Sequence, residues 1–303
     1  MNYLSFVTPE GAPTWGVASQ GTVYDLGPTG TARAASLHEA VTRGLFGTLT
    51  SADLTDAPAH AEQDITYLPC LTEPQKIICI GVNYRTHQEE SGKTGQTAPT
   101  VFTRFADTQM GHLAPAIKPA STGKFDYEGE MALVIGKEAW HVAKEDAFDV
   151  VAGYANYNDF SVRDWQKAAS QWIPGKNFPA TGAFGPYLVP ATDVGDVREL
   201  TLETRVNGQV RQHASVADLY FDIPTLINYV TGFTRLNPGD VIVTGTPGGV
   251  GLFWGEDGLL DAGDEVEVEI TGLGVLRNTV QDEADADASA SPLAALTALA
   301  QAG

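Results

Sequence analysis

The chain has 303 residues, of which 43% are hydrophobic, and its 18 basic and 38 acidic residues give a formal net charge of −20. This length and composition are typical of a globular protein with one large core or two domains. The negative charge disfavours nucleic acids and anionic membranes as principal partners, because both are negatively charged themselves.

Residues 1–70 are expected to form a small α+β domain. Short apolar pieces broken by Gly and Pro predict strands, and the spacing from Leu37 to Leu45 predicts a helix. The start lacks the features of a signal peptide, and no later stretch approaches the roughly 18 apolar residues of a membrane span. Cys70 and Cys79 match neither a zinc site nor a redox pair, so we expect reduced core cysteines in a soluble cytoplasmic protein.

The main domain is predicted over residues 71–281. Its polar segment 83–100 is typical of a mobile loop or lid. The strand that follows, FDYEGEMALVIG at 125–136, directs Glu128 and Glu130 to one face because strand side chains alternate. Past these residues both faces are apolar, and two carboxylates entering a strand covered on both sides require a compensating group such as a cation.

Two helices are predicted beyond that strand. The text DFSVRDWQKAASQW has the pattern of a helix, and a start near Asp159 would place Asp159, Arg163 and Gln166 on one face at i, i+4 and i+7. A second helix follows Asp222, a candidate N-cap, and carries apolar residues at i, i+3, i+4 and i+7 from Ile223 onward.

The last part of the sequence predicts turns and strands, followed by a tail. In AGDEVEVEITG, Val266, Val268 and Ile270 face one way, and the alternating glutamates face the other, which are Glu265, Glu267 and Glu269. Residues 282–303 are acidic and rich in alanine, which predicts a loosely held tail.

The charged residues also have simpler interpretations. Glu128 and Glu130 are compatible with solvated carboxylates at a strand end, and Asp159 and Arg163 with a surface ion pair. Taken together, three carboxylates without a nearby histidine or cysteine suit a hard ion such as Mg²⁺, Mn²⁺ or Ca²⁺ better than Zn²⁺. The glycine-rich GTPGGVG lacks the Lys-Ser/Thr that ends a phosphate-binding loop, so we expect no nucleotide there.

Five segments between about Lys76 and Val280 resemble a known family in their order and spacing. They are ICIGVNYRTHQEE, FDYEGEMALVIG, GYANYNDFSVRDWQ, PGKNFPATGAFGP and PGDVIVTGTPGGVG. The chain resembles the fumarylacetoacetate hydrolase superfamily, including its acylpyruvate hydrolase and 2-hydroxyhepta-2,4-diene-1,7-dioate isomerase types. The resemblance implies an α+β fold built on a distorted mixed β-roll, with a small N-terminal α+β domain, and a homodimer.

The resemblance also implies a role for nine residues. The implied metal ligands, for Mg²⁺ or alternatively Mn²⁺ or Ca²⁺, are Glu128, Glu130 and Asp159. The implied catalytic residues are His87, Glu90 and Lys176. The implied substrate-binding residues are Arg163, Gln166 and Thr246.

The implied reaction is hydrolysis of a carbon-carbon bond in a small 2-oxo acid or 1,3-dicarbonyl substrate of the acylpyruvate kind, through a metal-bound enolate. Histidine accepts protons near neutral pH, so His87, oriented by Glu90, is expected to activate water. Without an attacking water, the same groups would serve an isomerase or decarboxylase of 2-hydroxymuconate-type or oxaloacetate-type substrates in aromatic catabolism. A non-catalytic metal-binding protein is the alternative from another class.

Overall fold

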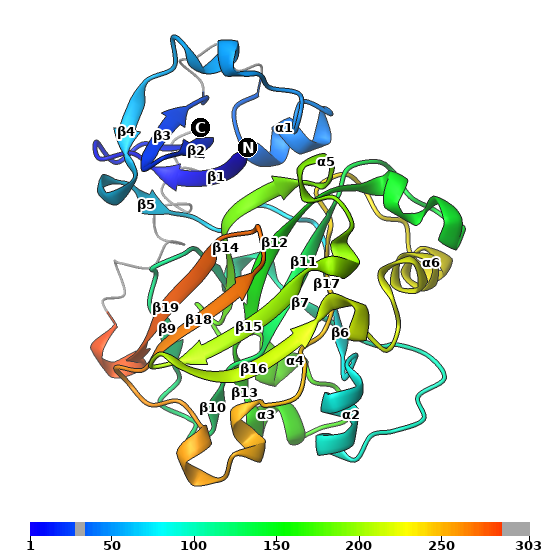
Figure 1. The fold of residues 1–303 in the computed structure, drawn as a ribbon. Helices are drawn as coiled ribbons and strands as arrows, with labels where there is room; N and C mark the ends of the chain where they lie inside the picture. The colour runs from blue at the N-terminus through cyan, green and yellow to red at the C-terminus, as the bar shows by residue number, and fades with distance from the viewer. Residues whose placement is uncertain (28–33, 287–303) are drawn as a thin grey trace.

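The computed structural model describes residues 1–27 and 34–286, in which strands dominate and helices are short (Figure 1). Its sheets combine antiparallel pairs, such as β11 (Gly129–Ile135) with β12 (Val151–Asp159), and parallel pairs, such as β6 (Ile77–Gly81) with β17 (Val241–Val243). The predicted α+β class with a mixed β-roll is confirmed. The predicted tail lies outside the described residues from position 287 onward.

Twelve strands of the described residues form one large sheet, whose N-terminal strands lie at one end of the molecule (Figure 1). Two of them pair outside the main path, β5 (Thr66–Tyr67) with β1 (Asn2–Val7) and β8 (Gln109–Met110) with β14 (Gly182–Pro190). The main path is, in spatial order, β4 (Ala59–Ala61), β3 (Thr22–Asp25), β2 (Pro13–Ser19), β1 (Asn2–Val7), β14 (Gly182–Pro190), β12 (Val151–Asp159), β11 (Gly129–Ile135), β17 (Val241–Val243), β6 (Ile77–Gly81) and β7 (Thr100–Arg104).

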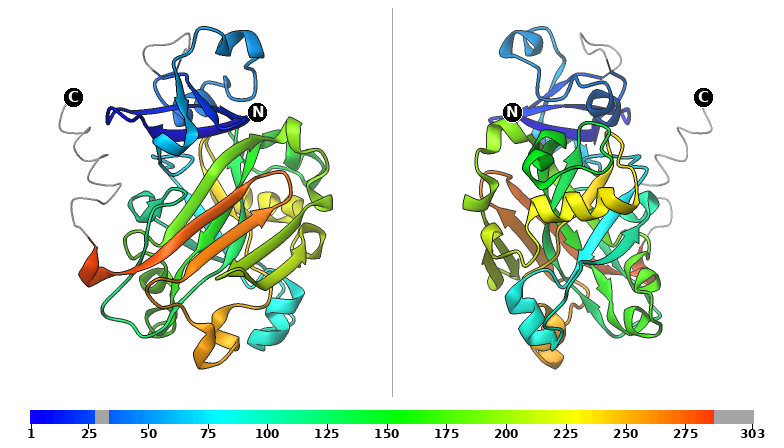
Figure 2. Two further views of the ribbon diagram at one scale, coloured as in Figure 1. Left: turned by 60° about the vertical axis from the view of Figure 1, so that its left-hand side comes forward. Right: turned by 90° about the vertical axis from the view of Figure 1, so that its right-hand side faces the viewer.

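A second sheet packs across β11, β12 and β14 of the first (Figure 2). Its strands are, in spatial order, β16 (Gln209–Ser215), β15 (Thr201–Val206), β18 (Glu265–Ile270), β19 (Val275–Asp282) and β9 (Ala116–Lys118). A two-stranded ribbon, β10 (Phe125–Asp126) with β13 (Ser161–Val162), lies next to the ends of β11 and β12.

The helices are short and lie around the sheets (Figure 1). They are α1 (Leu37–Thr42), α2 (Arg85–Ser91), α3 (Arg163–Lys167), α4 (Ile173–Lys176), α5 (Ala191–Val194) and α6 (Ile223–Phe233). The helices predicted near Leu37 and after Asp222 are confirmed, and the Asp222 side chain accepts a hydrogen bond of 2.9 Å from the backbone N–H of Thr225. No helix in the described part of the chain is long and apolar enough to cross a membrane.

Strand β11 joins the two main core clusters because its side chains alternate. Met131, Leu133 and Ile135 pack in a cluster with residues of α6 and of the second sheet. Ala132 and Val134 face a cluster that contains residues of β1, β2 and α1. The predicted burial of this strand on both faces is therefore confirmed, and the strand is anchored firmly at the position from which Glu128 and Glu130 project.

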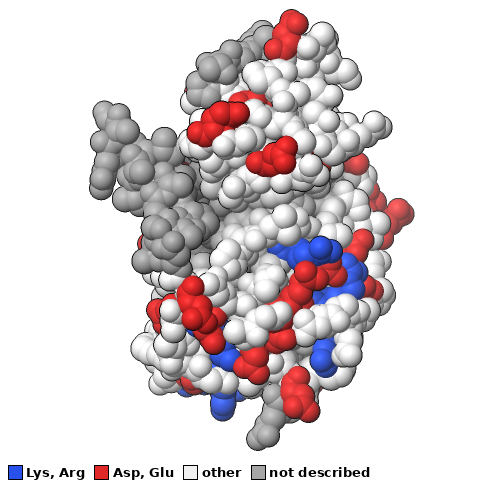
Figure 3. Space-filling model, turned by 90° about the vertical axis from the view of Figure 1, so that its left-hand side faces the viewer, with Lys and Arg blue, Asp and Glu red and all other residues white. Residues whose placement is uncertain are grey.

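The second sheet presents its charged face to solvent. Val266, Val268 and Ile270 are buried as predicted, and Arg205 on β15 pairs with Glu203, Glu267 and Glu269. Basic and acidic side chains accordingly lie side by side on this side of the molecule (Figure 3). Cys70 and Cys79 are buried and free, as predicted.

Candidate active site

Three carboxylates meet where β11 begins and β12 ends. The two strands are antiparallel, with Gly129 opposite Asn158, so the start of one lies beside the end of the other. Glu128 precedes β11, Glu130 is its second residue, and Asp159 is the last residue of β12. Oxygens of the three carboxylates all lie within 4.8 Å of one another, and all three residues are buried. The structure thus brings the three predicted metal ligands together.

The route by which Asp159 reaches the cluster differs from the prediction. Asp159 ends a strand, and helix α3 begins only at Arg163, after the two residues of β13. Pairing with both β11 and β14 keeps residues 151–159 extended, because a central strand satisfies its backbone groups on both sides. The expected i, i+4 placement and the alternative surface pair between Asp159 and Arg163 are both wrong.

Arg163 is buried and donates hydrogen bonds to three other side chains of the site. Its Nε donates to Asp126 Oδ2 at 2.7 Å, and its Nη1 donates to Glu128 Oε1 at 2.6 Å and to Gln166 Oε1 at 3.0 Å. Its Nη2 is buried and has no hydrogen-bond partner among the described residues. A buried donor without a partner is costly, so this N–H group is available to a ligand that brings an acceptor.

Lys176 is the last residue of α4, and its ammonium reaches the carboxylates. Its Nζ is 2.5 Å from Glu128 Oε2, 2.7 Å from Asp159 Oδ2 and 2.7 Å from Ser161 Oγ. This position requires Gly175, since a Cβ there would lie 2.3 Å from the backbone nitrogen of Gln166. Lys176 is only 1% exposed, so it is a buried lysine and not a surface charge.

The charges of the cluster do not balance. The cluster contains four carboxylates but only three basic side chains that form ion pairs with them. The carboxylates belong to Asp126, Glu128, Glu130 and Asp159, and the basic side chains to Arg104, Arg163 and Lys176. Burial alone would raise the pKa of Glu128, but Arg163 and Lys176 outweigh it and lower that pKa to about 2. Burial, followed by repulsion from Asp159 and Glu128, raises the pKa of Glu130 well above its usual range.

Two residues that complete this network were not predicted. Arg104 on β7 donates to Asp159, and also to Thr181 Oγ1 at 2.6 Å, so it fixes the last residue of β12. Asp126 accepts hydrogen bonds from Arg163 and from the backbone N–H groups of residues 251 and 252. Asp126 was detectable because it continues the alternation of Glu128 and Glu130, whereas no local spacing indicates Arg104.

Glu130 is held by the glycine-rich turn after β17. Its Oε2 accepts a hydrogen bond of 2.6 Å from the backbone N–H of Gly245, whose φ of +100° favours glycine. The next residue, Thr246, borders the cavity, and its hydroxyl accepts a hydrogen bond of 2.7 Å from Gln212. The turn therefore positions both a carboxylate and a hydroxyl at the site.

Part of the segment predicted as a loop or lid is helix α2. Tertiary packing decides this, because His87 and Gln88 on the helix are buried. His87 Nδ1 lies 2.6 Å from Glu90 Oε1, while Glu90 Oε2 accepts from the backbone N–H of Gly249 at 2.9 Å. With Nδ1 bound to Glu90, the other ring nitrogen, Nε2, is left as the proton acceptor.

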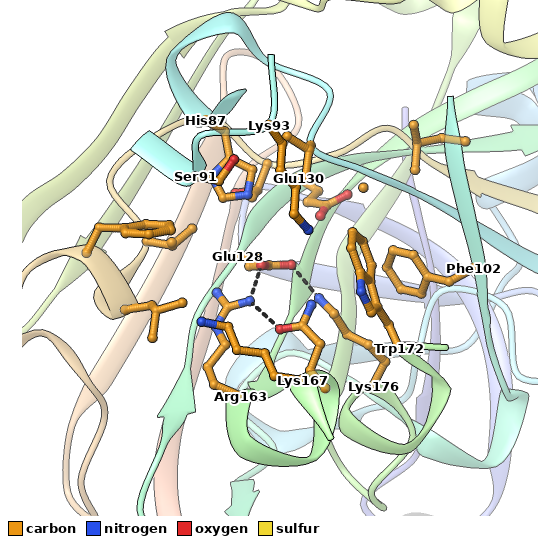
Figure 4. Close-up of a pocket in the computed structure, with 18 residues that line it drawn as sticks. His87, Ser91, Lys93, Phe102, Glu128, Glu130, Arg163, Lys167, Trp172 and Lys176 are labelled. Atoms are coloured by element: carbon orange, nitrogen blue, oxygen red, sulfur yellow. Dashed lines mark hydrogen bonds and ion pairs between the residues drawn. The ribbon is translucent and has the colours of Figure 1, made fainter. Parts of the chain in front are cut away.

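One cavity of about 170 Å³ connects these groups (Figure 4). Its walls include seven of the nine residues predicted for the site, which are His87, Glu128, Glu130, Arg163, Gln166, Lys176 and Thr246. Glu90 and Asp159 lie directly behind this wall, bonded to His87 and Lys176. Figure 4 shows Glu128 between Arg163 and Lys176, with His87 across the cavity.

The donor set of the cluster fits a hard divalent cation. It consists of carboxylate oxygens, which such ions prefer. Glu130 has no cationic hydrogen-bond partner among the described residues and accepts from one backbone N–H. A cation beside Glu128, Glu130 and Asp159 would remove the repulsion that raises the pKa of Glu130.

Comparison with known proteins agrees with the motifs. The family described as fumarylacetoacetate (FAA) hydrolase C-terminal matches residues 76–281. The chain belongs to the fumarylacetoacetate hydrolase family. It is 36% identical over 264 residues to a mitochondrial oxaloacetate tautomerase of Xenopus laevis, covering 86% of this chain and 83% of that protein.

Solved structures of this family share the fold. A fumarylacetoacetate hydrolase from Exiguobacterium antarcticum has a TM-score of 0.81 at 34% identity, with 93% of this chain and 100% of that one covered. Maleylpyruvate hydrolase from Sphingobium sp. SYK-6, in complex with manganese(II) and pyruvate, has a TM-score of 0.77 at 27% identity, with coverage of 93% and 99%. Since its relatives are enzymes that act on small molecules, this member of the fumarylacetoacetate hydrolase family is an enzyme.

Proposed function

We propose that this enzyme interconverts the keto and enol forms of a small 2-oxo acid of the oxaloacetate type, with a divalent cation bound by Glu128, Glu130 and Asp159. The observation that carries the proposal is the position of the His87–Glu90 pair across one small cavity from Arg163 and the three carboxylates. The similarity to oxaloacetate tautomerase supports the choice of substrate. Tautomerisation becomes the first candidate, ahead of the hydrolysis expected from the sequence.

The cavity suits a compact ligand. Pockets for drug-sized molecules enclose roughly 300–1,000 Å³, and this one encloses about 170 Å³. Arg163 Nη2 is free to bind a carboxylate at its inner end, next to Gln166. Mg²⁺ or Mn²⁺ suits the carboxylate oxygens, and when bound it would polarise the 2-oxo group of the substrate.

The protein's own groups then move one proton. His87 Nε2 removes a proton from C3, whose bonding pair forms the C2=C3 double bond, while the carbonyl pair moves onto the C2 oxygen. The proton then passes from the His87 imidazolium to that oxygen, directly or through water, to give the enol and regenerate neutral His87, and the reverse sequence returns the keto form. Glu90 holds Nδ1 of the ring and stabilises the imidazolium that forms in between.

Hydrolysis of an acylpyruvate-like substrate is the second candidate. The same pair of His87 and Glu90 would activate a water molecule for attack on the distal carbonyl carbon. The structural similarity to maleylpyruvate hydrolase favours this reaction.

Proton NMR in D₂O separates these reactions. With Mn²⁺- or Mg²⁺-loaded enzyme, we expect oxaloacetate to exchange its C3 protons faster than with the metal ion alone, without cleavage of its carbon chain. Pyruvate would indicate decarboxylation, and a carboxylic acid plus pyruvate from an acylpyruvate would indicate hydrolysis. Loss of the enzymatic rate with a chelator tests the metal, and an exchange rate equal to that of the free ion would overturn the proposal.

A further inference from the structure

The cavity is bordered by a second pair of cations that the reaction above does not use. Lys93 and Lys167 both line it, and both are exposed at its mouth. Unlike Arg163 and Lys176, neither forms an ion pair within the described residues. Arg205, by contrast, pairs with three glutamates on the second sheet.

The two lysines approach the cavity from opposite sides (Figure 4). Lys93 follows α2, and its Nζ lies 4.6 Å from the centre of the Trp172 ring, which also lines the cavity. Lys167 is the last residue of α3, directly after Gln166. The ring contact holds the Lys93 ammonium at the mouth of the cavity.

Their charges are close enough to affect each other. Partial burial, followed by the positive charges of Arg163, Lys124 and Lys93, lowers the pKa of Lys167. Like charges that border one cavity repel each other, and an anion bound between them would relieve that repulsion. The inner end of the cavity already offers Arg163 to one carboxylate, so the mouth is suited to another.

We propose that Lys93 and Lys167 form a second anion subsite that binds the distal carboxylate of the substrate, so that this enzyme selects 2-oxo acids with two carboxylates over those with one. The inference rests on the proposed function for the identity of the inner subsite. It assigns selectivity to two residues that lie outside the carboxylate cluster and outside the proton transfer at His87.

The test is a binding measurement with two probes that differ in one carboxylate. Titration calorimetry of the Mn²⁺-loaded enzyme compares (S)-malate with (S)-lactate for the original protein, for Lys93→Gln, for Lys167→Gln and for the double variant. We expect malate to bind more tightly than lactate in the original protein, and the double variant to reduce that ratio by about 10-fold, as expected for two partly exposed charge contacts. Lactate affinity is expected to stay unchanged, and rising salt should reduce the malate preference.

Lys124→Gln is the matched control, because Lys124 lies near Lys167 but does not line the cavity. It removes the same charge and is expected to leave the ratio of the two affinities unchanged. An unchanged ratio in the double variant, or an equal loss of lactate and malate binding, would overturn the inference. A reduced ratio in an enzyme that fails to exchange the C3 protons of oxaloacetate would support the subsite and overturn only the proposed reaction.

Discussion

The Lys176 ammonium lies 2.5 Å from Glu128 Oε2, and the same group is 2.7 Å from Asp159 Oδ2. One buried cation therefore bridges two of the three carboxylates. The third carboxylate, Glu130, accepts a hydrogen bond from the turn at Gly245 instead, and it lacks a cationic hydrogen-bond partner among the described residues. The structure thus provides both a preformed cluster and an unbalanced charge for an added cation.

Replacement of Lys176 is expected to lower the free energy of unfolding, mainly because it removes a buried charge and not because it removes volume. Lys176→Met leaves Glu128 and Asp159 buried without their shared cation, and breaking a buried pair in this way costs about 3–5 kcal/mol. Urea unfolding measures the loss, and added Mn²⁺ should restore more stability to the variant than to the original protein. Lys144→Met, on an exposed lysine, is the control and should change the free energy of unfolding by less than roughly 0.5 kcal/mol.

In the metal-free protein, Glu128 and Glu130 should affect the pH dependence of the free energy of unfolding in opposite directions. The lowered pKa of Glu128 contributes stability above pH 4.5, which is lost as the pH falls from 4.5 toward 2. The raised pKa of Glu130 contributes stability below 4.5, which is lost as the pH rises through its folded-state pKa. Stability should therefore decline on the alkaline side of this range as well as in acid.

Glu130→Gln isolates the second effect. Because the amide carries no charge, the variant should lose the alkaline decline and be more stable than the original protein at neutral pH without metal. Its Mn²⁺ affinity should fall by more than the roughly 10- to 100-fold that loss of an outer-shell partner costs. Urea unfolding across pH and Mn²⁺ titration provide the two readouts; a variant that keeps both the decline and the affinity would remove Glu130 from the proposed metal site.

Much of this site was predictable from the sequence because its signals are local. Alternation along 125–136 places Glu128 and Glu130 together, and the spacing of His87 and Glu90 matches one turn of α2. The manner in which Asp159 arrives was not predictable, since pairing with β11 and β14 keeps it in a strand.

The role of Arg104 was likewise not predictable from the sequence. It is 55 positions from its partner Asp159, and only the assembled sheet brings the two together. Non-local pairing therefore accounts for most of what sequence reasoning missed, at the site as well as in the fold.

Replacement of His87 should separate binding from chemistry. His87→Ala removes the proposed proton acceptor but none of the three carboxylates, so Mn²⁺ affinity should remain close to that of the original protein. Turnover should fall on the order of 100- to 10,000-fold, the usual contribution of a positioned general base. His213→Ala, at an exposed histidine, should leave turnover unchanged. Unaltered turnover in His87→Ala would exclude the His87–Glu90 pair from the reaction.

Two glycines offer a matched test of how backbone packing positions Lys176. A Cβ at Gly175 would lie 2.3 Å from the backbone nitrogen of Gln166, so Gly175→Ala must push α4 away from α3 and move the Lys176 ammonium. A Cβ at Gly232, within α6, meets nothing within 4 Å. Gly232→Ala should therefore stabilise the protein by about 0.5–1 kcal/mol, because alanine favours the helix.

Urea unfolding and Mn²⁺ titration of both variants provide the comparison. Gly175→Ala should lower the free energy of unfolding, turnover and Mn²⁺ affinity together, since Glu128 and Asp159 share Lys176. Equal behaviour of the two variants would mean that α4 can shift without disturbing the carboxylates. In that case the close approach of Gly175 to Gln166 would not be what sets the geometry of the cluster.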